Sequence, residues 1–225
     1  MIRLCLGAFA FMLATACSYG SAVDLAPLSE RLANPAISPG DFCGVEGEKP
    51  PFTVVSSEDC IPVTWDTATR TYTVVGDSDD PEDTLQVSPV ALGDGVYLAQ
   101  AIVDPDDKDI PDRFQLFVLI SAGDAFALLP VLENEDFAAV ARRHPAITFR
   151  EDRAGRPYIA GGDRPAIRAF LREAAAEALK VVRSEDDPVV VGVRDKAGAA
   201  DHPASGEQAR DIETVLQIAR DLGGG

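Results

Sequence analysis

The chain contains few of the residues that carry common enzyme chemistry: two histidines, four cysteines and one tryptophan in 225 residues. His144 and His202 each precede a proline, a turn-like setting that does not orient a base between a nucleophile and an acid. No Gly-x-Ser-x-Gly motif and no glycine-rich phosphate loop is present. These absences weigh against a serine hydrolase and a nucleotide-binding enzyme.

Excess positive charge and a membrane-spanning run are also absent. The formal net charge is −17, which disfavours nonspecific binding to nucleic acid. The longest apolar run, Leu4–Leu13, is shorter than the roughly 20 residues that a transmembrane helix needs. No repeat of solenoid period is found. We therefore expect no nucleic-acid partner, and no motif calls for a cofactor.

The N-terminus has the features of an export signal. Arg3 precedes the apolar run, which is followed by small residues and then Cys17. The sequence Ala14-Thr15-Ala16-Cys17 resembles the lipobox of bacterial lipoproteins, with Ala14 in place of the preferred leucine. The resemblance implies cleavage before Cys17, lipidation of this cysteine, and anchoring in the outer membrane facing the periplasm, because Ser18 rather than Asp follows.

The alternative interpretation is ordinary cleavage after Ala16, which gives a soluble periplasmic protein. In both cases Arg3 is removed, so the mature charge becomes −17 − 1 = −18. If lipidation holds, the partners are the membrane, through the lipid anchor, and an envelope protein.

The cysteines predict one disulfide. Cys5 leaves with the signal and Cys17 is taken up by the lipid, so Cys43 and Cys60 remain as an even pair in an oxidising compartment. Their bridge would contribute about 3 kcal/mol in the loop-entropy model. A metal site at this pair is disfavoured, because the sequence has no Cys-x-x-Cys and no histidine nearby.

The hydropathy pattern predicts an α+β fold, with a mostly antiparallel β-meander sheet and a C-terminal helix packed on it. Turn residues separate the expected strands, which cover residues 61–66, 71–75, 87–92, 96–103, 114–120, 126–132, 147–150 and 156–160. Residues 188–193 could form an edge strand. Helical spacing of apolar residues predicts helices over 135–143, 164–182 and 207–222.

Composition suggests five segments. We expect a signal peptide over residues 1–16, a flexible lipid-anchored tether over 17–41 and a globular domain over 42–182. A linker over 183–205 and an amphipathic helix with its tail over 206–225 would follow.

Two charged regions are candidate sites. Residues 104–112 resemble the calcium repeats of thrombospondin type 3, with Lys108 and Asp109 in place of the expected Asp and Gly. This resemblance implies Asp104, Asp106, Asp109 and Asp112 as candidate calcium ligands, although a solvated acidic loop is the preferred interpretation. Arg164, Arg168 and Arg172 recur every four residues and could form an anion or partner patch, or internal ion pairs.

These observations favour a periplasm-facing envelope lipoprotein that acts as a structural, adaptor or binding module without enzymatic activity. The alternative is a carrier of a small apolar ligand in a β-sheet cavity, because the aromatic residues of the expected strands could line one. A soluble periplasmic enzyme of unknown chemistry is the third hypothesis. No catalytic residue is assigned.

Overall fold

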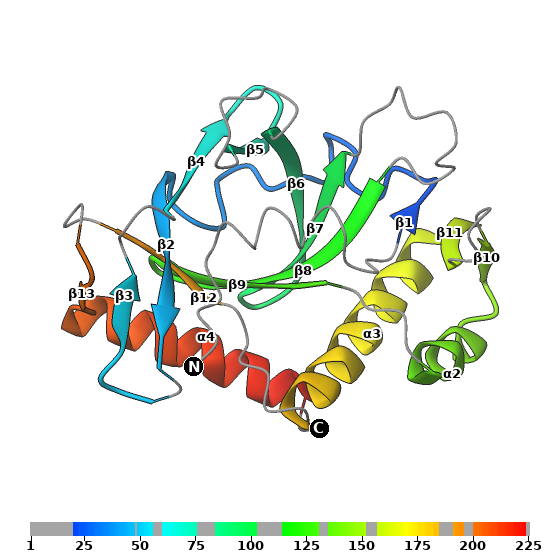
Figure 1. The fold of residues 1–225 in the computed structure, drawn as a ribbon. Coiled ribbons are helices and arrows are strands. Elements are labelled where there is room, and N and C mark those ends of the chain that lie inside the picture. The colour runs from blue at the N-terminus through cyan, green and yellow to red at the C-terminus, as the bar shows by residue number, and fades with distance from the viewer. Residues whose placement is uncertain are drawn as a thin grey trace.

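The fold is seen in a computed structural model, shown in Figure 1. The structure describes residues 20–47, 49–55, 60–75, 84–102, 114–130, 135–151, 157–184, 191–195 and 200–223. Its strands are β1 (Gly20–Ser21), β2 (Gly40–Glu46), β3 (Thr53–Val55), β4 (Ile61–Asp66), β5 (Thr71–Val75), β6 (Thr84–Gly93), β7 (Val96–Ile102), β8 (Phe114–Ala122), β9 (Ala125–Pro130), β10 (Ile147–Glu151), β11 (Pro157–Gly162), β12 (Val191–Arg194) and β13 (His202–Pro203). Its helices are α2 (Glu135–Arg143), α3 (Arg164–Ser184) and α4 (Gly206–Gly223).

The sheet closes on itself. Antiparallel pairing runs from β2 through β4, β5, β6, β7, β8, β9 and β12, and β12 pairs with β2 again, which makes a closed eight-strand barrel. The expectation of an α+β fold with an open meander is therefore wrong. In the part of the chain that the structure describes, the helices α2, α3 and α4 pack outside the barrel. A meander and a barrel share the same local strand pattern, and only the pairing of the first and last strands separates them.

Alternation along the strands gives the barrel two apolar surfaces. In β4, Ile61 and Val63 point inward and are buried, whereas the intervening Pro62 and Thr64 are exposed. In β8 both faces are buried. Phe117 and Leu119 join the barrel interior, and the side chains that alternate with them join a second core outside the barrel wall. This double burial explains why β8 is a continuous apolar run.

Helices cover one side of the barrel. In Figure 1, α4 runs below β9 and β12, and α3 crosses beneath β8 and β9. The buried side chains Ile167, Phe170 and Leu171 of α3, with Ile212 and Val215 of α4, join the outer core. The amphipathic spacing of both helices predicted these stripes, and both helices are confirmed with ends close to the expected positions.

Residues 20–39, which we expected to belong to a flexible tether, are packed on the domain instead. β1 pairs with both β8 and β11. After it, residues 22–39, here called the N-terminal strap, bury Leu25, Ala26 and Ile37. The Leu25 amide donates to the side chain of Gln100 in β7 at 2.7 Å. The strap has little regular secondary structure, and it is held on the domain by these buried side chains and by the hydrogen bond to Gln100.

The expected linker over 183–205 contributes a barrel strand. β12 lies between β2 and β9, with Gly192 opposite both Gly44 and Phe126. A Cβ atom at Gly192 would lie 2.7 Å from the Phe126 ring, so the missing side chain lets this ring lie against the closing strand. Val191–Arg194 is thus an internal strand of the barrel and not an edge strand.

The local turn and helix predictions agree with the structure. Gly95, in the turn between β6 and β7, has a φ of 69°, the left-handed conformation that this hairpin requires. α2 ends at Arg143, as its predicted range of 135–143 does, and His144-Pro145 follows directly, where the residue before proline avoids the helical conformation. Among the described residues, no helix has the length and apolarity needed to cross a membrane.

Candidate functional site

The barrel interior contains a small apolar cavity of about 50 Å³. Its wall comes from seven of the eight barrel strands and from the strap, so no single segment of the sequence forms it. The lining side chains are all apolar apart from one tyrosine hydroxyl: Ile37, Phe42, Ile61, Val63, Tyr72, Val74, Leu85, Val87, Ala99, Phe117, Leu119, Phe126 and Leu128. The volume exceeds the minimum of about 10–15 Å³ for one water molecule, but an apolar cavity of this kind tends to remain dry.

Tyr72 closes one part of this cavity together with the strap. Its hydroxyl accepts a hydrogen bond from the Ile37 amide at 2.9 Å and donates one to the Ile37 carbonyl at 3.1 Å. Burial raises the pKa of Tyr72 to about 12. Because its hydroxyl is occupied by the backbone of Ile37, the cavity presents hydrocarbon to any occupant.

The burial of the lining residues indicates where the cavity approaches the surface. Phe42, Ala99 and Phe117 are buried, whereas Val74 and Leu85, which face each other across β5 and β6, remain partly exposed. The strap covers the opposite side, where Ser121 donates to the Ala36 carbonyl at 3.1 Å. The cavity therefore has a closed side at the strap and a more open side near the Val74–Leu85 pair.

Two residues of the candidate arginine patch share one carboxylate. Arg164 donates to Glu30 of the strap at 2.6 Å, and Arg168 pairs with the other oxygen of the same carboxylate. All three residues border an open surface groove of about 730 Å³. Arg172 is exposed one turn further along α3 and does not line the groove. The sequence left open an anion or partner patch and internal ion pairs. For Arg164 and Arg168 the structure shows ion pairs, and their partner is Glu30 of the strap.

Other predicted site residues lie outside the described residues. These are Cys17, the candidate lipid attachment site, and the candidate calcium ligands Asp104, Asp106, Asp109 and Asp112. The structure neither brings these residues together nor separates them, so both interpretations stay predictions.

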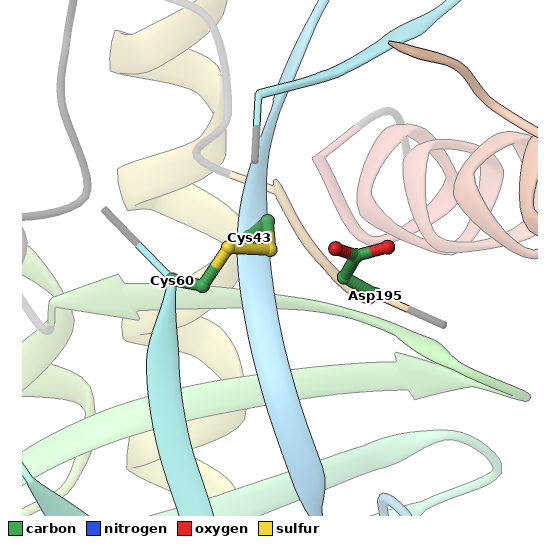
Figure 2. Close-up of side chains that lie close together, drawn as sticks. All are labelled: Cys43, Cys60 and Asp195. Carbon is green, nitrogen blue, oxygen red and sulfur yellow. A yellow bond between two sulfur atoms is a disulfide. The ribbon is translucent and has the colours of Figure 1, made fainter. Parts of the chain in front are cut away.

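The predicted disulfide between Cys43 and Cys60 is confirmed. Cys43 lies in β2 and Cys60 directly precedes β4, next to the paired residues Phe42 and Ile61. Asp195, which follows β12, brings a carboxylate to the same place, and Figure 2 shows it beside the bridge. One ligand atom from each of Cys43, Cys60 and Asp195 lies within 4.8 Å of the others.

His202 of β13 contacts Asp195 and lies outside the group of atoms within 4.8 Å of one another. Its Nε2 atom lies 3.1 Å from Asp195 Oδ1. A hydrogen bond to the Pro203 carbonyl is the main cause that raises the pKa of His202, and the bond to Asp195 adds to it. We call Cys43, Cys60, Asp195 and His202 the disulfide cluster.

Tyr72 belongs to the aromatic residues that were expected to line a cavity, and it does. Sequence reasoning missed its bond to Ile37 and two further partners, Glu30 and Asp195, because each contact joins residues that no local spacing relates. The proline after His202 suggested a turn and gave no sign of its contact with Asp195.

Comparison with known proteins gives no relative. No protein-family model matches the chain, and neither a curated protein nor a solved structure matches it. Function must therefore be argued from the sites themselves.

Proposed function

We propose that this protein is an exported envelope lipoprotein that binds one narrow apolar group in its barrel interior. The observation that carries the proposal is the cavity: it is enclosed by a closed eight-strand barrel and its exposed lining is hydrocarbon. Eight-strand barrels have an interior that is either just filled by side chains or able to hold one small ligand. The residual cavity favours the second use.

The cavity size restricts the ligand. Its volume of about 50 Å³ is well below the roughly 300 Å³ of pockets that enclose a drug-sized molecule. The fitting ligand is therefore one whose narrow end enters, such as the terminal part of a hydrocarbon chain, with its polar part left outside. The net charge of −17 disfavours anionic headgroups, so we expect a neutral or cationic amphiphile.

An adaptor role receives less support from the described surface. Large exposed apolar side chains there are few, namely Leu28 and Ile102, so no broad apolar patch is marked for a partner. Arg164 and Arg168 share Glu30, which lowers the charge available to an anionic partner. The carrier, second among our sequence hypotheses, becomes the first.

The signal sequence supports anchoring at Cys17. A domain on a long flexible tether could move away from the membrane, whereas this domain begins close to the anchor. Gly20 in β1 follows Cys17 by three positions, with two residues between them, and a fully extended chain spans at most about 3.5 Å per residue, or roughly 10 Å here. A lipid on Cys17 would therefore hold the barrel close to the membrane surface. Soluble periplasmic release remains the alternative outcome.

Calorimetric titration with decanol, a neutral single-chain amphiphile, tests ligand binding. We expect saturable binding of one molecule per barrel, with a negative heat-capacity change from apolar burial, and weaker binding of decanoate. Ala99→Val adds volume to a fully buried wall residue and should reduce decanol affinity at least tenfold. Ala91→Val, at an exposed position of β6 that does not line the cavity, is the matched control and should bind as the unaltered protein does.

Two outcomes contradict the proposal. The first is the absence of saturable decanol binding to the folded protein. The second is equal decanol affinity for Ala99→Val and Ala91→Val, which would place the binding outside the barrel.

A further inference from the structure

The disulfide cluster contains a carboxylate and an imidazole, which are metal-ligand groups that a structural disulfide does not need. The bridge joins the start of β4 to β2, and cross-strand pairing of Phe42 with Ile61 already fixes these two strands. Next to it lies Asp195, whose side chain is only 6% exposed, in contact with the imidazole of His202. A nearly buried carboxylate is costly unless it has partners. Asp195 has such a partner in His202, and the pair brings a carboxylate and an imidazole to the side of the bridge where the Asp195 carboxylate lies.

Two cysteine thiolates, one imidazole and one carboxylate are the ligand types that Zn²⁺ prefers in tetrahedral sites. Three of the candidate atoms, those of Cys43, Cys60 and Asp195, lie within 4.8 Å of one another. His202 reaches this group through Asp195, with its Nε2 atom 3.1 Å from Asp195 Oδ1, so it would have to turn toward the sulfur atoms to bind the same ion. The sulfur atoms of an intact disulfide are not thiolates and do not supply these ligands. A site of this kind can exist only after reduction.

We propose that reduction of the Cys43–Cys60 disulfide converts the disulfide cluster into a zinc site, with Cys43, Cys60, Asp195 and His202 as ligands. A dithiol reductant supplies two electrons and two protons, so that the S–S bond becomes two thiols and the reductant becomes a disulfide. Zn²⁺ then binds both sulfur atoms as thiolates and displaces the two thiol protons. The proposal does not use the barrel interior and is independent of ligand binding there.

The barrel holds the ligands together without the covalent bridge. Cys43 lies opposite Val193 of β12, and β12 ends directly before Asp195. The Asp195 amide donates to the Asp41 carbonyl at 2.8 Å, which fixes the start of the Asp195 side chain beside β2. Because these contacts are backbone pairings of the barrel, they persist when the sulfur–sulfur bond breaks, and the site requires only side-chain adjustment.

The positions of the two cysteines also suit conversion between the disulfide and the reduced form. Cys43 is buried, whereas Cys60 is partly exposed, so an incoming thiolate reaches the Cys60 sulfur first. Attack there forms a mixed disulfide at Cys60 and releases the sulfur of Cys43 beside Asp195 and His202. The second thiol of the reductant then releases Cys60.

The test uses the full mature chain, reduced with a phosphine and titrated with Co²⁺ as a spectroscopic substitute for Zn²⁺. We expect one ion per chain, sulfur-to-cobalt charge-transfer absorption, loss of that absorption when Zn²⁺ is added, and release of two protons. The oxidised chain should show none of these. Asp195→Asn and His202→Gln should each weaken binding by about 10- to 100-fold, while His144→Gln, which changes the other histidine, should have no effect.

Circular dichroism of the reduced chain is recorded first, with and without Zn²⁺. A reduced chain that binds no ion, or that unfolds and is not restored by Zn²⁺, overturns the proposal. So does unchanged Co²⁺ affinity in Asp195→Asn or in His202→Gln, or equal binding by the oxidised chain.

Discussion

Replacement of Tyr72 by phenylalanine tests how the strap is held on the barrel. One hydroxyl serves both the amide and the carbonyl of Ile37, and both residues are buried. Tyr72→Phe leaves those two backbone groups without a partner in an apolar environment. A buried polar group left unsatisfied costs about 1–3 kcal/mol, so we expect the free energy of unfolding to fall by about 2–4 kcal/mol.

The matched control is Tyr97→Phe. Tyr97 packs against the same interior cluster, and its hydroxyl makes no hydrogen bond to the residues that the structure describes. Loss of this hydroxyl should change the free energy of unfolding by no more than about 0.5 kcal/mol. Urea unfolding of both variants, followed by tryptophan fluorescence and circular dichroism, measures the difference. In thermal unfolding, the same loss of stability in Tyr72→Phe corresponds to a Tm difference of roughly 4–16 °C for a chain of this size.

Two further readouts separate a local from a general effect. Because burial raises the pKa of Tyr72 to about 12, its proton stabilises the fold fully below the ordinary tyrosine pKa, and this contribution is lost as the pH rises through about 12. Ultraviolet titration should therefore show a late-ionising tyrosine that is missing from Tyr72→Phe. Hydrogen exchange at the Ile37 amide should become faster in that variant. Equal stability of Tyr72→Phe and Tyr97→Phe would refute the account of the strap.

Other consequences of the structure can be measured directly. Cys43→Ser should lower the free energy of unfolding by about 3 kcal/mol under oxidising conditions, and an unchanged chemical denaturation midpoint would show that the bridge adds nothing. Cys17→Ala should move the protein from the membrane fraction to the soluble fraction; its retention in membranes would exclude the proposed lipid anchor. The hydrogen bond from His144, with Arg143 beside it, lowers the pKa of Glu173. Glu173 therefore stabilises the fold above its ordinary pKa of 4.5 and loses this effect as the pH falls through the lowered value. The Tm curves of the unaltered protein and Glu173→Gln should converge over that fall in pH, and parallel curves would contradict the assignment.

Short-range patterns predicted most of the elements. Alternation over residues 61–66 and 71–75 gave the β4–β5 hairpin, and the His144-Pro145 sequence gave the end of α2. These features depend on neighbouring residues alone: side-chain period, turn conformation and the steric restriction before proline. The cysteine count predicted the disulfide for a different reason. Once Cys5 and Cys17 are assigned to the expected signal and lipid anchor, two cysteines remain and they have one way to pair.

Long-range pairing decided what the local patterns left open. Val191–Arg194 closes the barrel by joining β2 and β9, although the surrounding composition is typical of a linker. Strand closure depends on which distant backbones meet, and a four-residue strand carries too little sequence to encode its partners.

The sequence by itself thus determined most of the strands, the three helices and the disulfide, because each depends on local chemistry or on counting; β1, β2, β3 and β13 were not predicted, and the export signal stays a prediction. Only the tertiary structure determined the closed barrel with its apolar cavity, the Glu30 contact with Arg164 and Arg168, and the meeting of Asp195 with the disulfide and with His202. The physical reason is that barrel closure places residues side by side by strand register, and register is set by the packing of the whole sheet rather than by spacing along the chain.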